Sequence, residues 1–214
     1  MTTTTVRSFA WLFCMALFIL AAAGAAPAAT SAISTPLNPP IGEEPWCVGW
    51  RFQALQDVNV VSLGALDPIP AGGLPSSMDV GIWTDSGTLL GSLTVSAGTA
   101  GTLIDGYFYA DLTTPISLTS GDFYRIADSP TSGNNDNDYM FSGVSITDSA
   151  AVGYDQGYLV ENTNSLVFPT VAGSSDDFFG PNFQYVPVPE PTSFTLVALG
   201  VAACAGYRSP RRKN

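Results

Sequence analysis

The sequence predicts an all-β protein: a single β-sandwich or jelly-roll domain, flanked by an N-terminal signal-peptide helix and a short C-terminal transmembrane helix. Three observations predict this fold. Between residues 46 and 186, short runs alternate apolar and polar side chains and are separated by Gly, Pro, Asn, Asp and Ser. No ten-residue window in this range has the apolar period of a helix. A segment of ~140 residues buries enough surface to fold without a disulfide.

The alternating runs define the candidate strands of this domain. They are Val48–Gln53, Asn59–Leu66, Met78–Trp83, Thr88–Ser96, Gly106–Leu112, Tyr124–Ala127, Met140–Ser145, Tyr158–Glu161, Leu166–Phe168 and Asn182–Val186. The clearest hairpin turns at Asp85-Ser86-Gly87, where Gly87 can adopt the left-handed conformation that a three-residue loop needs. Residues 46–186 are therefore assigned to the domain, and residues 29–45 to a linker that precedes it.

Residues 1–28 have the three parts of a secretory signal peptide. Arg7 gives a positive start, residues 9–23 form an apolar run, and small residues follow directly. Two patterns of small residues, ending at Ala25 and Ala28, fit signal-peptidase cleavage. The alternative is an uncleaved membrane anchor, and the shortness of the apolar run favours cleavage.

Residues 187–214 also form three consecutive parts. The first is a proline-rich motif: Val188, Pro189, Glu190 and Pro191. The second is an apolar run over 192–207, which as a helix would span about 24 Å at ~1.5 Å per residue, against a bilayer core of ~30 Å. The third is a basic stop that would hold the C-terminus in the cytoplasm. Its residues are Arg208, Arg211, Arg212 and Lys213.

This order of motif, apolar run and basic cluster resembles the PEP-CTERM sorting signal of exported Gram-negative proteins. The resemblance covers residues 188–214. It implies that an exosortase, a membrane-embedded transpeptidase-like enzyme, is a partner of the chain. It also implies transit through the inner membrane by way of residues 192–207, and delivery to the cell surface or to an extracellular matrix that contains polysaccharide.

The middle of the chain resembles a jelly-roll domain of unknown function that occurs ahead of such tails. The resemblance covers residues 45–186 and implies a fold and export, but no catalytic residue. The stretches that carry it are Val48–Phe52, Val61–Gly64, Val80–Trp83, Gly87–Leu90, Pro115–Leu118, Gly121–Arg125 and Phe178–Phe183.

Charge and composition exclude several classes of function. Between Pro27 and Pro189 there are seventeen acidic residues and two arginines, a net charge of −15, which argues against nucleic-acid binding. The chain has no histidine, so a Ser-His-Asp triad, a Cys-His pair and a His-ligated zinc site are impossible. No pair of carboxylates is marked as catalytic by its sequence surroundings. We therefore expect no enzyme activity.

One polar loop carries side-chain oxygens at every second residue, a spacing that is common among calcium ligands. Asn134, Asp136 and Asp138 are its candidate ligands. An EF-hand is excluded because Tyr139 stands where that loop needs glycine, and because Ser145 replaces the final glutamate. A solvated Asn- and Asp-rich turn is the alternative, and no other cofactor is expected.

Cys47 is the only cysteine of the exported part, since Cys14 and Cys204 lie in the two terminal apolar runs. It is interpreted as a small buried side chain, the alternative being a reactive thiol or an intermolecular bridge.

Two functions from different classes remain. The first is a non-enzymatic surface or matrix protein. The second is a carbohydrate-binding module, with or without calcium, that stacks sugars on aromatic side chains. An exposed row of the aromatics would favour the second function, and burial of the same side chains would favour the first. The residues concerned are Trp83, Tyr107, Tyr109 and Tyr154.

Overall fold

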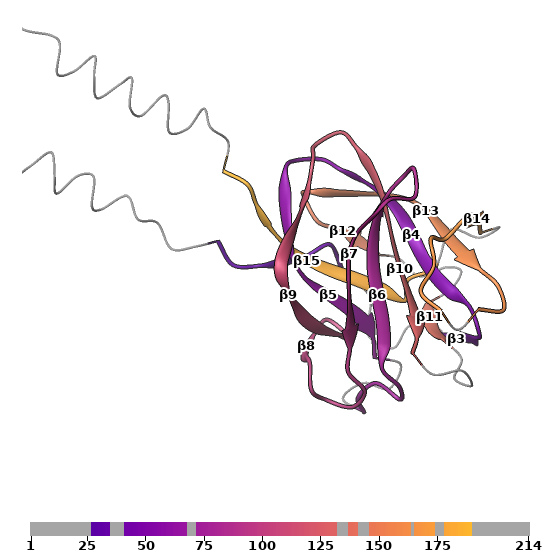
Figure 1. Cartoon of the computed structure of the whole chain (residues 1–214). Helices are drawn as coiled ribbons and strands as arrows, with labels where there is room; N and C mark the ends of the chain where they lie inside the picture. The colour runs from indigo at the N-terminus through magenta and orange to yellow at the C-terminus, as the bar shows by residue number, and fades with distance from the viewer. Residues whose placement is uncertain are drawn as a thin grey trace, which may run out of the picture.

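The computed structural model describes residues 27–34, 41–67, 72–131, 137–140, 146–163, 165–173 and 178–189, with the backbone alone at 41–43 and 137–140. Within these ranges every regular element is a β-strand, so the predicted all-β class is confirmed (Figure 1). The described residues contain no helix that is long and apolar enough to cross a bilayer. The predicted signal-peptide helix and C-terminal helix fall outside the described residues.

Two antiparallel sheets make up most of the described chain. The first has the strand order β1-β15-β5-β9-β8, and the second has the order β14-β13-β4-β10-β6-β7. The strands of the first are β1 (Thr30–Ser31), β15 (Pro181–Pro187), β5 (Val58–Leu66), β9 (Tyr107–Leu118) and β8 (Thr102–Ile104). Those of the second are β14 (Val171–Ala172), β13 (Val152–Val160), β4 (Cys47–Ala54), β10 (Phe123–Pro130), β6 (Met78–Thr84) and β7 (Leu89–Val95). We call them the β15 sheet and the β4 sheet.

Two short ladders add to these sheets. In one, β11 (Asn137–Met140) pairs with β3 (Ile41–Glu44), and in the other β12 (Thr147–Asp148) pairs with β2 (Ile33–Ser34).

The core lies between the two sheets and is centred on aromatic side chains. Phe183 of β15 stacks on Trp50 of β4 with ring centroids 6.0 Å apart, and it lies 5.0 Å from the ring of Phe52. Phe179 completes the group against Trp50 at 6.3 Å. All four side chains are fully buried. The Trp50 indole satisfies its donor by bonding the Pro181 carbonyl at 2.9 Å, so the aromatic core joins β4 to β15.

The predicted hairpin is confirmed at residues 78–95. β6 and β7 pair antiparallel, and the Thr84 amide donates to the Thr88 carbonyl at 2.9 Å. Gly87 has φ +93°, the left-handed conformation expected of it.

The strands differ from the predicted ones where the sequence pattern is interrupted. β9 continues to Leu118 although Pro115 lies within it, because the strand has no neighbour in the sheet on its β8 side beyond Tyr109. β13 begins at Val152, earlier than predicted, and a bulge between Tyr154 and Gln156 within this strand interrupts its alternation of apolar and polar residues. The predicted strand 166–168 is wrong: this segment has no strand conformation. Residues 141–145 of another predicted strand lie outside the described residues.

The predicted linker at 29–45 also needs correction. Ala32 and Ile33 are fully buried in the core, and β1 pairs with β15. The folded unit therefore extends to Thr30, well before Trp46.

Truncating the central core residue tests this description. Phe183→Ala should lower the free energy of unfolding by ~3–5 kcal/mol, because it removes the ring that Trp50 and Phe52 share and leaves a cavity. Chemical denaturation followed by tryptophan fluorescence measures the loss. Leu103→Ala, at a side chain 41% exposed, is the control and should change stability by less than ~0.5 kcal/mol. Equal losses for both variants would contradict the described core.

Candidate functional site

The chain leaves the sandwich directly into the proline-rich motif. β15 ends at Pro187, and the amide of Val188 still donates to the Asp57 carbonyl at 3.0 Å. Val188 and Pro189 are the last described residues of the chain, and both are exposed. The structure therefore places the first half of the predicted motif at the surface. Glu190 and Pro191 lie outside the described residues, as does the basic stop, Arg208, Arg211, Arg212 and Lys213.

A network of hydrogen bonds fixes the surface around this exit point. The Asp57 carboxylate accepts the Ser120 amide at 2.7 Å, and the Ser120 hydroxyl donates to the Leu55 carbonyl at 3.1 Å. The Leu55 amide in turn donates to the Ala151 carbonyl at 2.8 Å. Leu55 is 51% exposed and Val188 is 36% exposed. We call Leu55, Asp57, Ser120 and Val188 the motif rim.

The N-terminal strand meets the same end of the sandwich. β1 runs antiparallel to β15, with Thr30 opposite Tyr185, so the described N-terminal residues lead away on the side from which β15 exits (Figure 1). Asn182 fastens this segment: its amide nitrogen donates to the Ile33 carbonyl at 2.9 Å, and its amide oxygen accepts the Ile33 amide at 3.4 Å. The two ends that lead toward the predicted export signals are thus joined in one sheet.

The two arginines of the exported part lie side by side on the outer face of the β4 sheet. Arg51 and Arg125 are direct cross-strand partners, an arrangement in which like charges repel. Asp85 resolves the repulsion, because its carboxylate accepts from Arg51 at 2.9 and 3.0 Å and from Arg125 at 3.0 Å. Asp155 adds a second acceptor for Arg51 at 2.7 Å.

The ionisation of these groups follows from their contacts. Hydrogen bonding to Arg51, more than to Arg125, lowers the pKa of Asp85. The Arg51 guanidinium has a raised pKa, chiefly through its hydrogen bonds to Asp85. Arg51 also covers the Phe123 ring at 3.9 Å from its centroid. The two arginines are therefore neutralised by Asp85 and Asp155. Because Asp85 lies in the β6–β7 turn, these bonds also hold that turn against the sheet.

Residues 166–169 cover the neighbouring part of this face. Phe168 packs on Trp83 with centroids 6.3 Å apart, and Arg125 donates to the Pro169 carbonyl at 2.7 Å. Cys47 lies beneath this segment, fully buried, free, and bonded through Sγ to the Val167 carbonyl at 3.4 Å. Burial raises the pKa of the Cys47 thiol to about 12, so it is not ionised at neutral pH. The interpretation of Cys47 as a small buried side chain is confirmed.

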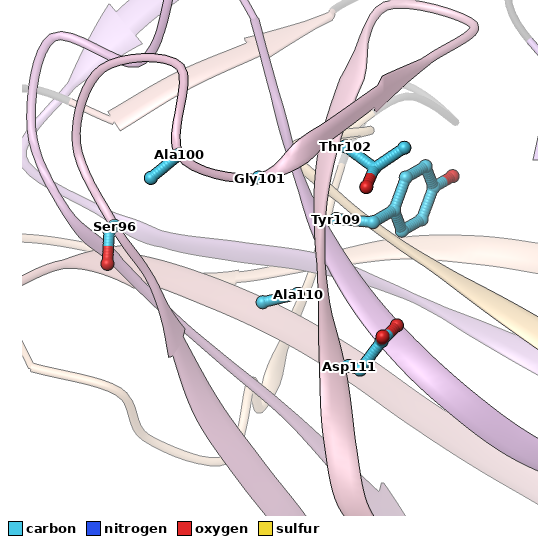
Figure 2. A pocket seen from close by; sticks show the side chains of 7 residues that line it. All are labelled: Ser96, Ala100, Gly101, Thr102, Tyr109, Ala110 and Asp111. Atoms are coloured by element: carbon cyan, nitrogen blue, oxygen red, sulfur yellow. The ribbon is translucent and has the colours of Figure 1, made fainter.

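Two hollows lie on the surface formed by the described residues. The first, of about 290 Å³, lies where β8 and β9 meet the loop after β7. Figure 2 shows Tyr109 and Asp111 pointing to one side of β9 and Ala110 to the other. The Asp111 carboxylate accepts the Ser62 hydroxyl at 2.8 Å, and burial raises the pKa of Tyr109. The Asp111 carboxylate and the Tyr109 side chain are therefore engaged by the β15 sheet itself.

The second hollow, of about 430 Å³, lies beside β1 and contains Asp105 and Asp148. Both carboxylates are exposed to water, and that of Asp148 accepts the Tyr154 amide at 3.0 Å. A catalytic acid of a glycosidase is usually buried, which raises its pKa, and these two residues lack that burial.

The calcium hypothesis falls largely outside the described chain. Asn134 and Asp136 are not among the described residues, whereas Asp138 lies in β11 opposite Glu43 of β3. Within the described ranges, no three His, Cys, Asp or Glu side chains are grouped as a metal site requires.

The aromatic side chains considered for sugar stacking belong to the interior. Trp83, Tyr107 and Tyr109 are buried, and Tyr154 packs on Trp50 at 6.4 Å and on Phe179 at 5.0 Å.

A β domain whose last strand runs straight into a proline-rich motif, an apolar run and a basic tail has the layout of an exported protein with a C-terminal sorting segment. The chain carries a PEP-CTERM protein-sorting motif, matched over residues 187–213. This match confirms the predicted sorting signal at the C-terminal end of the chain. The motif implies export with transit through the membrane, and an exosortase as the processing partner. No curated protein matches the chain.

Sequence reasoning found the motif and missed the motif rim. Leu55, Asp57 and Ser120 are separated along the chain, and only the pairing of the sheets brings their turns beside Val188. An apolar residue in a turn, Leu55, was the one available signal.

Removing the shared carboxylate should destabilise the arginine pair. Asp85→Asn leaves Arg51 and Arg125 opposed without a counter-charge, and we expect a loss of roughly 1–2 kcal/mol after allowing for solvent screening. Asp122→Asn, which removes the same charge from an exposed position nearby, should cost less than ~0.5 kcal/mol. Denaturant unfolding at pH 7 compares the two.

The pH dependence of this difference has a defined sign. Because the folded pKa of Asp85 is lowered, its stabilisation is complete above the unfolded pKa of ~3.9. It is lost as the pH falls through the folded value, so wild type and Asp85→Asn should converge in acid. A gap that widens below pH ~4 would contradict the described pairing.

The Asn182 bridge should hold the N-terminal segment in place. Asn182→Ala leaves the buried Ile33 carbonyl without its donor and should cost ~1–3 kcal/mol. It should also speed hydrogen exchange at residues 30–34. Asn59→Ala, which removes an exposed side-chain bond to Ser117 on the same sheet, is the control and should leave this exchange unchanged. Equal exchange in both variants would show that the bridge does not hold the segment.

Proposed function

We propose that this chain is an exosortase-sorted protein that serves, once exported, as a non-enzymatic component of the cell surface or extracellular matrix of a Gram-negative bacterium. The observation that carries the proposal is the sorting motif at residues 187–213, which begins where β15 ends. The exported unit would be the whole sandwich, because β15 is one of its interior strands.

The non-enzymatic part of the proposal is supported by the chemistry of the hollows. In the first, Asp111 and Tyr109 are bonded or buried within the β15 sheet. In the second, Asp105 and Asp148 are exposed carboxylates with no histidine anywhere in the chain to act beside them. A structural role asks only for a stable fold with a soluble surface, and the acidic sandwich supplies both.

A matrix role is favoured over a carbohydrate-binding module because of where the aromatic rings lie. Trp83 is covered by Phe168, and Tyr107 and Tyr109 face the interior. Such rings are occupied by protein contacts and offer no platform on which a sugar could stack.

Processing at the motif is the direct test. The protein released from cells that contain the exosortase should have an intact mass that excludes the residues after the motif, including Arg211 to Asn214. Glu190→Ala should leave full-length precursor in the inner membrane, with the sandwich folded, because it removes the one charged side chain of the motif. The prolines on each side are kept, so the backbone stays extended and a loss of processing reports on the carboxylate.

Glu161→Ala is the matched control, since it removes the same side chain from an exposed position of the sandwich. It should be processed like the wild type. A released protein that keeps Arg211 to Asn214 would show that the segment is a simple anchor.

A further inference from the structure

We propose that the sorting enzyme docks on the motif rim, so that Leu55 and Val188 are part of the surface it contacts. The inference rests on the proposed function, because it takes the processing at the motif as given. It adds a second contact, on the folded domain, to the motif that the enzyme is expected to recognise.

The tether between the sandwich and the apolar run is short. Val188 is the last described residue whose backbone is bonded to the sandwich, through the Asp57 carbonyl. The apolar run begins at Thr192, four residues later. Four residues reach at most about 14 Å even when fully extended. The rim therefore lies within ~14 Å of the point where the precursor enters the membrane.

This tether leaves little space between the rim and the membrane. A small folded domain is ~30 Å across, roughly twice the reach of the tether. No folded part of an enzyme fits between the rim and the membrane without touching the sandwich. An enzyme that holds Glu190 must therefore approach along the membrane surface and lie against the rim.

The residues before the motif are held in the β15 sheet. Val186 and Pro187 are register partners of Asn59 and Val58 in β5. An active site that bound several residues on the amino side of the motif would have to peel this strand away. The available contact on that side is consequently the outer surface of the rim, with β15 still paired.

The rim also has the composition of a protein contact. Leu55 and Val188 are two of the six large apolar side chains left exposed among the described residues. Leu55 lies two residues before Asp57, and the Val188 amide donates to the Asp57 carbonyl. The bonds among Leu55, Asp57 and Ser120 hold the turns rigid, so that little entropy is lost on docking. An apolar pair on a fixed backbone, in an otherwise acidic domain, suits the less charged centre of a protein interface.

The test uses the full chain in cells that contain the exosortase. Leu55→Gln should slow conversion of precursor to mature protein at least about threefold in a pulse-chase measurement. Leu103→Gln is the control, because Leu103 is 41% exposed against 51% for Leu55 but lies at the far end of the β15 sheet. It should be processed at the wild-type rate. Thermal unfolding should show that both variants are folded.

A spacer between the rim and the motif distinguishes a loss of docking from a loss of motif recognition. A six-residue Gly-Ser insertion between Val188 and Pro189 lengthens the tether by ~13 Å on average. The enzyme then reaches the motif without touching the rim, so Leu55→Gln and the wild type should be processed equally in this background. A defect of Leu55→Gln that persists with the spacer would overturn the docking.

Crosslinking identifies the neighbour of the rim. Photo-reactive benzoylphenylalanine in place of Leu55 should form an adduct with the exosortase, and in place of Leu103 it should not. An adduct with lipid alone would show that the rim rests on the membrane, and it would overturn the docking. Equal processing of Leu55→Gln and Leu103→Gln would do the same. A wild-type chain that is never processed would overturn the proposed function as well.

Discussion

The insertion of β15 between β1 and β5 is the constraint on which the rest of this structure depends. Phe183 brings the ring that joins Trp50 and Phe52, and the Pro181 carbonyl satisfies the Trp50 indole. A strand that comes last in the sequence but lies inside its sheet cannot be added as an optional edge. The sandwich is therefore complete only when the chain has been delivered through Pro187, the residue at which the match to the sorting motif begins. The last residues needed to complete the fold are therefore followed directly by the residues needed for sorting.

The same constraint explains how the two ends of the domain are joined. Since β15 is interior, its second neighbour must come from elsewhere in the chain, and β1 occupies that place. The bonds from Asn182 to Ile33 fix the register of the pair. The two ends that lead toward the predicted export signals thus close into one sheet, and loss of either end strand would expose the core.

Much of the fold was predictable from the sequence because it depends on local alternation. The β4, β5, β6, β7 and β10 strands follow the pattern of apolar side chains, and Gly87 supplies the turn that joins β6 to β7. The errors have physical causes. Residues 166–169 are apolar because they cover Trp83 and Cys47, and burial by covering has the same sequence pattern as burial in a strand. Residues 30–34 hold only two apolar side chains, Ala32 and Ile33, too few to mark a strand, and their pairing depends on Asn182, which lies about 150 positions away.

The candidate site divides in the same way. The motif is contiguous, so its residues could be named from the sequence, whereas the rim is assembled by turns that only the folded sheets bring together. The two arginines were visible as the sole cations between Pro27 and Pro189, but their cross-strand pairing and their shared use of Asp85 were not. The rim and the arginine pair thus depend on how the strands pair, which residue type alone does not reveal.

The arginine cluster has a consequence for the whole surface. Because Arg51 and Arg125 are both bound to carboxylates, no cation of the described exported part is left to offset the remaining acids. A domain with a net charge of −15 is repelled by an anionic membrane surface, and this repulsion decays over a Debye length of ~8 Å at physiological ionic strength. In the proposed precursor, the tether to Thr192 keeps the near side of the domain within ~14 Å of the membrane, under two Debye lengths, where the repulsion is weakened by salt but not abolished. Cleavage at the motif would release that constraint, and the charge that opposes the membrane would then favour departure of the domain from it.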